Sequence, residues 1–210
     1  MYKRFLILIF FTLAFRLNAG NFYIDKNASG SDNGSSWSDA WENFQNINWD
    51  SIKPGDTIFV SGGTDSVIYT DFMEIGASGV ESNLVTITKG IDPGHNGRVI
   101  IEGLNNEKTT AFHIEDKNFL KISNFEIRRF TGGGSIRVEN SIGSVIEKNK
   151  ILGYGSCVKI YNSFNCIIRE NVLTTHENTP TQTDGIYASQ NTDNVYENNN
   201  IIILNQDSYP

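Results

Sequence analysis

Two stretches of the sequence share one pattern: IRVENSIGSVIEKNKIL at 136–152 and VKIYNSFNCIIRENVLT at 158–174. Each begins with alternating apolar and polar residues, and each has an Asn thirteen positions after its first residue. Alternation with a period of two is typical of a β-strand that buries one face. Short units that recur in this way indicate a stacked, solenoid-like architecture.

The repeat extends beyond these two stretches. Short alternating segments begin at Phe112, Ile136, Val158 and Ile186, so successive starts are separated by 24, 22 and 28 positions. Two further series have the same three separations. They are Ile122, Ile146, Ile168 and Tyr196, and Ile127, Ile151, Leu173 and Ile201. The unit is therefore one coil of about 22 residues with three short strands, lengthened in places by loop insertions.

A coil of this kind predicts an all-β fold, the right-handed parallel β-helix, with neighbouring coils about 4.8 Å apart. A propeller blade needs roughly 40 residues, and a leucine-rich repeat needs regular Leu positions. This chain has only 10 Leu, against 26 Ile and 25 Asn. Asn149, Asn171 and Asn199 occupy equivalent positions, which predicts a stack of amide side chains at one turn.

The segments 57–60, 85–87 and 99–101 are predicted strands of earlier coils. Residues 37–52 are predicted to include a short amphipathic helix with Ala40, Trp41, Phe44 and Ile47 on one face. The expected organisation is an N-terminal cap over residues 20–56 and β-helix coils over 57–210. These coils are expected to be incomplete at the C-terminal end, because no closing element follows the strand at 201–203.

The first nineteen residues resemble a signal peptide. Lys3 and Arg4 precede an apolar run at 5–15, and Ala19 offers a cleavage position. An uncleaved anchor is the alternative. Cleavage predicts a secreted or periplasmic protein without a membrane partner. It would remove Lys3, Arg4 and Arg16 and so change the net charge from −7 to −10. This acidity argues against nucleic-acid binding, and we expect a monomer.

Cys157 and Cys166 are the two cysteines of the chain. Export would permit a disulfide, while burial as two small core residues is the favoured interpretation. The sequence leaves their pairing open.

The beginning of the mature chain resembles a known group of proteins. FYID at 22–25, GSDNG at 30–34, Trp37 and KPGDTI at 53–58 follow one another as in secreted right-handed parallel β-helix proteins of the pectate-lyase-like superfamily. The resemblance covers essentially all of the mature chain and implies the fold. It is weak for the reaction, because that superfamily includes lyases, hydrolases, epimerases and non-catalytic members.

In that superfamily, sugar chains lie on the outward face of the first strand of each coil. Here this face would present His113, Arg137, Lys159 and Tyr187, followed by the row Glu115, Glu139, Tyr161 and Ser189. Lys159 is the candidate base and Arg137 the candidate group that neutralises a substrate carboxylate. His113, Tyr161 and Tyr187 are candidate sugar contacts. The alternative is an ordinary solvated face on which Arg137 pairs with Glu115 or Glu139.

Ca²⁺ is the candidate cofactor, because carboxylates on neighbouring coils suit this ion. Glu115, Glu139 and Asp184 are the candidate ligands. Asp184 begins an Asp-Gly-Ile turn similar to one in polygalacturonase-like hydrolases, although no paired Asp motif accompanies it. His176, in the loop before this turn, is a further candidate sugar contact.

We therefore expect a carbohydrate-active protein that binds an extended acidic polysaccharide, most simply a lyase that cleaves by Ca²⁺-assisted β-elimination. A glycoside hydrolase of the same fold and a non-catalytic surface or adhesion module are the alternatives. Arg128 and Arg129 form a separate basic patch that could meet an acidic polymer or belong to a solvated turn.

Overall fold

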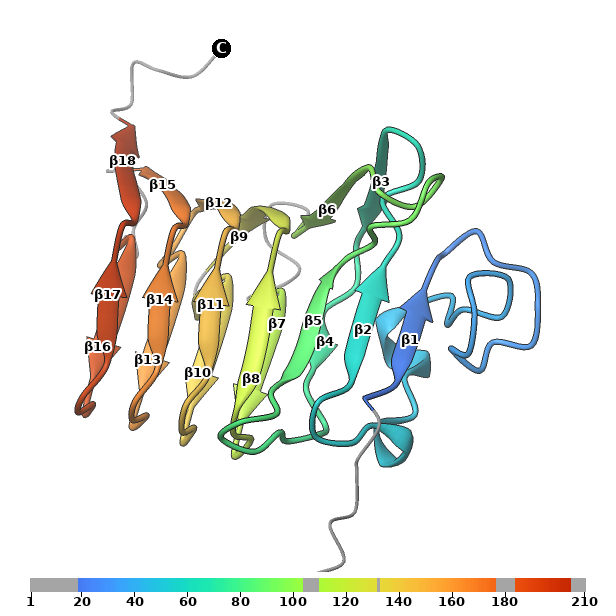
Figure 1. Cartoon of the computed structure of the whole chain (residues 1–210). Coiled ribbons are helices and arrows are strands. Elements are labelled where there is room, and N and C mark those ends of the chain that lie inside the picture. The colour runs from blue at the N-terminus through green and yellow to red at the C-terminus, as the bar shows by residue number, and fades with distance from the viewer. Residues whose placement is uncertain (1–18, 104–109, 132, 177–183, 205–210) are drawn as a thin grey trace, which may run out of the picture.

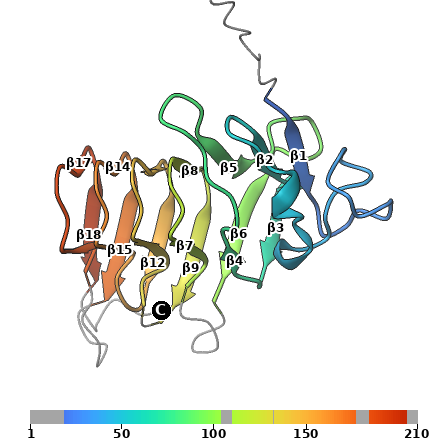
Figure 2. The same ribbon diagram turned by 90° about the horizontal axis from the view of Figure 1, so that it is seen from below.

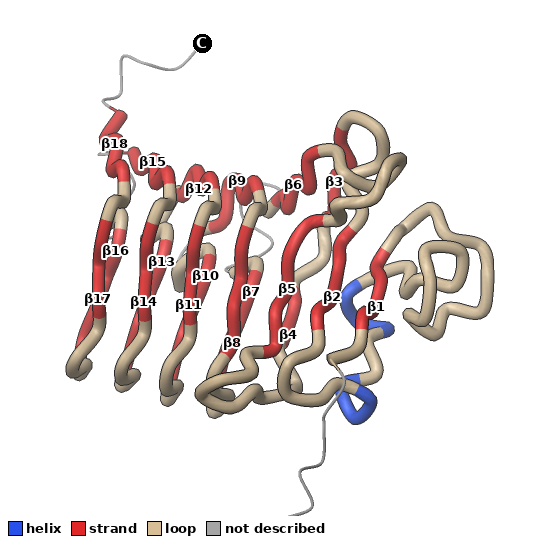
Figure 3. The backbone as a smooth tube through the Cα atoms, viewed as in Figure 1, coloured by secondary structure: helices blue, strands red, loops and turns tan. Residues whose placement is uncertain are grey.

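The computed structural model describes residues 19–103, 110–131, 133–176 and 184–204. Their strands form three parallel sheets that run along one axis (Figures 1 and 3). In the coils that follow Phe112, each turn of the chain contributes one strand to each sheet. The predicted parallel β-helix is thereby confirmed.

Each sheet is named by its number of strands. The seven-stranded sheet contains β1 (Asn21–Ile24), β2 (Thr57–Val60), β5 (Val85–Lys89), β8 (Leu120–Ser123), β11 (Val145–Glu147), β14 (Ile167–Arg169) and β17 (Val195–Glu197). The six-stranded sheet contains β3 (Ser66–Tyr69), β6 (Arg98–Glu102), β9 (Glu126–Phe130), β12 (Lys150–Gly153), β15 (Val172–His176) and β18 (Asn200–Leu204), several of which run side by side in Figure 2. The five-stranded sheet contains β4 (Met73–Glu74), β7 (Phe112–Glu115), β10 (Ile136–Glu139), β13 (Val158–Tyr161) and β16 (Ile186–Ser189).

The pairing register follows the sequence repeat residue by residue. Ile136 pairs with Val158, and Ile151 pairs with Leu173, so both pairs have the same separation along the chain. The inward side chains of these strands are fully buried, as at Ile114, Val138 and Ile160. A one-residue slip would turn every one of them to solvent, so the alternating pattern fixes the register.

The predicted Asn stack is present at the two-residue corner between the second and third strands of each coil. The Asn149 backbone N–H donates to Asn171 Oδ1 at 3.0 Å, and the Asn171 N–H donates to Asn199 Oδ1 at 3.1 Å. The Phe125 N–H donates to Asn149 Oδ1 in the same way. Because Asn149 and Asn171 are almost completely buried, these bonds satisfy amides that would otherwise have no partner. We call this series the Asn ladder.

The N-terminal segment differs from its prediction. Residues 37–52 contain two 3₁₀ helices, η1 (Phe44–Asn46) and η2 (Trp49–Ser51), rather than one amphipathic α-helix. The Asn43 side chain accepts hydrogen bonds from the backbone N–H groups of Gln45 and Asn46, which closes a tight turn instead of a longer helix. The predicted buried set is nevertheless correct, because Ala40, Trp41, Phe44 and Ile47 all lie in the core.

Both cysteines are free and buried, which confirms their interpretation as core residues. Burial raises the pKa of the Cys157 thiol to about 12, so this group is held in its protonated form at neutral pH. Within the described residues, no helix is both long enough and apolar enough to cross a bilayer.

The last described coil leaves apolar side chains uncovered. Tyr196 and Ile201 are in register with the buried Ile168 and Leu173, yet they are 43% and 49% exposed.

Glu147 is a charged group on the seven-stranded sheet that should make stability depend on pH. Its carboxylate lies 2.5 Å from Lys121 Nζ and 2.7 Å from an Arg169 guanidinium nitrogen. Burial on its own raises the pKa of Glu147, but the hydrogen bonds and charges of Lys121 and Arg169 outweigh burial and hold it below its ordinary value of 4.5. A carboxyl group whose pKa is lower in the folded state stabilises the protein at pH values above its ordinary pKa. This contribution is lost as the pH falls through the folded-state pKa.

We therefore expect the free energy of unfolding, measured in urea at pH values on both sides of 4.5, to decline more steeply in acid for the parent protein than for Glu147→Gln. The exposed Glu81 provides the matched control, since Glu81→Gln also removes one carboxylate. Equal acid slopes for Glu147→Gln and the parent would contradict this assignment.

Candidate functional site

The outward face of the five-stranded sheet carries the predicted candidate residues in two rows. Strand pairing aligns Glu74, His113, Arg137, Lys159 and Tyr187 across five neighbouring strands. The second row, two residues further along the strands, contains Glu115, Glu139, Tyr161 and Ser189. Adjacent members of a row are about 4.8 Å apart across the sheet. The structure thus brings most of the predicted residues onto one face, which we call the strand face.

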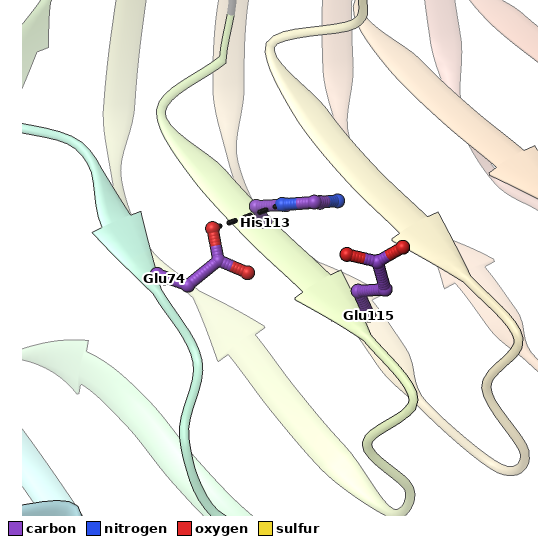
Figure 4. Close-up of side chains that lie close together, drawn as sticks. All are labelled: Glu74, His113 and Glu115. Carbon is purple, nitrogen blue, oxygen red and sulfur yellow. Dashed lines mark hydrogen bonds and ion pairs between the residues drawn. The ribbon is translucent and has the colours of Figure 1, made fainter.

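A chain of polar contacts joins three neighbouring coils on the strand face. His113 Nδ1 lies 2.9 Å from a Glu74 oxygen, and His113 Nε2 lies 3.3 Å from Glu139 Oε2 (Figure 4 shows the Glu74 contact). An Arg137 guanidinium nitrogen donates to the other Glu139 oxygen at 2.8 Å. Arg137 thus pairs with Glu139, which is one of the two pairings expected if this were an ordinary solvated face.

These contacts keep Glu139 ionised. Burial alone raises the pKa of this carboxyl, but the hydrogen bonds from Arg137 and His113, together with their charges, outweigh burial and lower it. Arg137 is therefore held in one orientation by a buried carboxylate, while its Nε atom is buried without a partner among the described residues. A guanidinium fixed in this way is suited to bind a substrate carboxylate.

Lys159 differs from the other cations of the strand face. No ion pair of Lys159 occurs within the described part of the chain, and its Nζ atom lies 5.5 Å from the centre of the Tyr187 ring. The turn at 133–134 leaves room for this side chain. Gly134 has a φ of +106°, and a Cβ atom there would lie 2.7 Å from Lys159 Cβ. Only glycine accommodates both this backbone conformation and this close approach.

Three side chains approach closely enough to share a metal ion. One ligand atom from each of Glu74, His113 and Glu115 lies within 4.8 Å of the others (Figure 4). The two exposed carboxylates are ligands that Ca²⁺ prefers, whereas an imidazole is more typical of zinc and other transition metals. Each imidazole nitrogen of His113 already has a carboxylate partner. The donor set therefore suits Ca²⁺ through Glu74 and Glu115.

The structure places the predicted metal ligands differently from one another. Both oxygens of Glu139 are engaged, by Arg137 and His113. Asp184 lies three strands away from Glu115 and five residues earlier along the strand direction. Strand geometry makes each of these separations about 15 Å. Asp184 and Glu115 are therefore not brought to one ion. Asp184 Oδ2 is buried without a hydrogen-bond partner in the described residues.

Two further candidates have different positions. Tyr161 lies on the strand face and is 37% exposed, as a sugar contact requires. His176 is expected in a loop from the sequence, but its backbone ends the strand β15 and pairs with Leu204 of β18, so it belongs to the six-stranded sheet. Residues 177–183 of the loop that follows lie outside the described residues, as do residues 1–18 of the predicted signal peptide.

Sequence reasoning missed Glu74. The strand β4 is a very short one, and Glu74 precedes its neighbour His113 by 39 positions, which is further than any separation within the repeat. The available signal was the apolar–polar–apolar pattern of Met73, Glu74 and Ile75, with both flanking residues buried. It matches the pattern of Phe112, His113 and Ile114.

No protein-family model and no curated protein matches this sequence. Similar solved structures include a pectate lyase, Pel9A, at 12% identity and a TM-score of 0.57, covering 89% of this chain and 53% of that chain. They also include an alginate lyase from Paenibacillus sp. str. FPU-7, at 14% identity and a TM-score of 0.54, covering 73% and 61%. The fold is that of a pectate-lyase-like parallel β-helix.

A third similar structure is the GH136 lacto-N-biosidase from Eubacterium ramulus, at 11% identity and a TM-score of 0.52, covering 82% of this chain and 41% of that one. The chain spans 53% and 61% of the two lyases. At these identities the similarity extends to the fold alone, and proteins with this fold perform different reactions.

Proposed function

We propose that this protein binds an extended acidic polysaccharide along the strand face and cleaves it by β-elimination. The observation that carries the proposal is the contrast between two neighbouring cations. Arg137 is fixed by the buried carboxylate of Glu139, and Lys159 in the same row has no ion pair within the described residues. A fixed cation beside an amine that no carboxylate holds is the pair that β-elimination from a uronate needs.

Arg137 would bind the carboxylate of the sugar at the cleavage point. The negative charge that develops beside this carboxylate when the C5 proton leaves is stabilised by the guanidinium. Lys159 would accept that proton. The electrons of the broken C5–H bond would form the double bond between C4 and C5, and the glycosidic oxygen would leave C4 with its bonding pair and take up a proton from solvent. Tyr161 and Tyr187 offer flat faces for neighbouring sugars, and a flat sheet suits a polymer better than a small metabolite.

Ca²⁺ belongs to this proposal as a cofactor. Glu74 and Glu115 would hold the ion, which would supply further positive charge for substrate carboxylates. We also propose that the protein acts outside the cytoplasm, since its first nineteen residues resemble a signal peptide.

The test is a panel of pectate, alginate and glycosaminoglycans, each incubated with the protein in chelator and in added Ca²⁺. We expect one acidic polymer to yield products that absorb ultraviolet light through their new double bond, with a faster rate in Ca²⁺. New reducing ends without this absorbance would show that the protein is a hydrolase and would reject the proposed lyase activity. Binding of a polymer without any product would reject the lyase activity in favour of a non-catalytic binding module.

The hydrolase is the second candidate because Glu74 and Glu115 bring carboxylate oxygens within 4.8 Å of each other. Glycoside hydrolases use two carboxyl groups at short range, and retaining enzymes place them about 5 Å apart. Glu74→Gln would abolish a hydrolase of this kind.

A further inference from the structure

A second charged surface lies on the six-stranded sheet, where the sequence places Arg128 and Arg129. The strand β9 contains a β-bulge at this point. Leu152 of β12 pairs with Arg128, whereas the next residue, Gly153, pairs with Phe130, so Arg129 is the extra residue. Arg129 has a φ of +59°, a left-handed conformation that is unusual for a residue with a side chain.

The bulge changes which side chains face outward. In a regular strand Arg129 would point toward the bore, because successive side chains alternate. Here Arg128 and Arg129 are both partly exposed, at 33% and 38% of their side chains, while Phe130 is buried. The bulge therefore presents two adjacent guanidinium groups on the outer surface and returns the aromatic ring to the core. Bulges that redirect side chains in this way are frequent near functional sites.

The arginines belong to a cluster with more cations than carboxylates. Arg128 donates to Glu126 Oε1 at 2.6 Å, and Lys150 Nζ lies 3.5 Å from the same oxygen. Arg98 approaches the other Glu126 oxygen at 3.5 Å. Arg129 donates to Glu102 at 2.8 Å. Among the residues that the structure describes, four cations thus surround two carboxylates, in a chain whose overall net charge is −7.

Apart from Arg98, these charged residues line a groove of about 580 Å³, together with Ile127, Ile151, Leu152 and Thr174. This volume lies within the range of small-molecule sites. Glu126 stays ionised, because burial raises its pKa but the hydrogen bonds and charges of Arg128 and Lys150 outweigh burial and lower it. Glu126 is shared by three cations, so it neutralises only part of their charge. An anion that entered the groove would meet positive charge and two planar guanidinium groups.

We propose that this groove binds an anionic sugar unit of an acidic polysaccharide, at a site separate from the strand face. Arginine suits this role because its planar, forked donors match a carboxylate or sulfate group. The choice of a carboxylated sugar, a uronate, rests on the proposed function, since the strand face is proposed to act on the same polymer. The strand face would cleave the polymer, and the groove would hold a second segment of it.

The experiment is a calorimetric titration of the full chain carrying Lys159→Gln, so that the ligand is not cleaved. The probes are hexameric oligouronates prepared from pectate and from alginate. We expect two binding sites for one of these probes. Addition of Arg128→Gln should weaken one site about tenfold, which corresponds to about 1.4 kcal/mol. Addition of Arg137→Gln should weaken the other site.

Lys148→Gln is the matched control. It also removes one positive charge, from an exposed ion pair with Glu170 that does not line the groove. Its isotherm should equal that of the protein that carries Lys159→Gln alone. Equal isotherms for Arg128→Gln and Lys148→Gln, or a single site lost with Arg137→Gln, would overturn the groove assignment. A sulfated hexasaccharide that binds the groove more tightly than both uronates would overturn the uronate assignment.

The titration separates this inference from the proposed function. If Arg128→Gln binds more weakly but no polymer yields product, the groove is a binding site and the proposed lyase activity is rejected. If the parent protein forms product but the isotherm of Arg128→Gln is unchanged, the lyase activity is supported and the groove is rejected as a binding site. Thermal unfolding of each variant identifies losses of binding that come from unfolding.

Discussion

Replacement of Lys159 by Gln is expected to slow formation of unsaturated product about a thousandfold, because a positioned general base contributes between about 10² and 10⁴ to a rate. Gln has a similar length and can still form hydrogen bonds, but it cannot accept the C5 proton. The effect should fall on kcat, since Arg137 and the tyrosines of the strand face remain in place to bind the polymer. Initial rates of ultraviolet absorbance across a range of polymer concentrations measure it.

Lys148→Gln is the control for the loss of one charge and should keep the parent rate. A Lys159→Gln protein that retains more than about a tenth of the parent kcat would show that another group removes the proton.

The largest effect on stability is expected for Asn171→Ala. The Asn171 side chain accepts from the backbone N–H of Asn149 and donates to the carbonyl of Ile146 and to Asn199 Oδ1. Alanine would leave the buried Asn149 N–H and the Ile146 carbonyl without these partners, and each such loss costs about 1–3 kcal/mol. We expect a loss of about 3–5 kcal/mol in the free energy of unfolding, a large share of the total for an ordinary domain.

Urea denaturation of the two proteins measures this difference. The control is Asn83→Ala, at an exposed position outside the ladder, which should change the free energy of unfolding by less than about 0.5 kcal/mol. A similarly small change in Asn171→Ala would mean that the Asn ladder adds little to stability.

The fold and the two rows of the strand face are predictable because both depend on the repeat. A strand period of two and a fixed spacing between coils determine which residues pair and which side chains face outward. The repeat alone therefore places Arg137 beside Lys159 and locates the Asn ladder. Neither placement requires knowledge of side-chain conformation.

The remaining features depend on interactions that the repeat does not encode. Glu74 contacts His113 from a very short strand outside the periodic region. The choice of Glu139 rather than Glu115 as the partner of Arg137 depends on side-chain conformation. The bulge at Arg129 breaks the alternation itself, so a pattern with a strict period of two would assign Arg129 to the wrong face. The same limitation explains why one α-helix was predicted where the structure has two 3₁₀ helices. The side chain of Asn43 closes a turn, and the spacing of apolar residues does not reveal this turn.

The Asn ladder also determines where this protein can change in length. The corners that it occupies have the same short length in every coil from Asn124 onward: 124–125, 148–149, 170–171 and 198–199. The connections from the third strand of a coil to the next coil instead vary, spanning 103–111, 131–135, 154–157 and 177–185. One of the three edges of the solenoid therefore has a constant length, while a second edge, on the other side of the six-stranded sheet, varies in length. This variable edge joins the sheet of the strand face to the sheet of the basic groove. Extra residues at 154–157 would extend the loop between the strand face and the groove, while the strands of every coil would keep their pairing register.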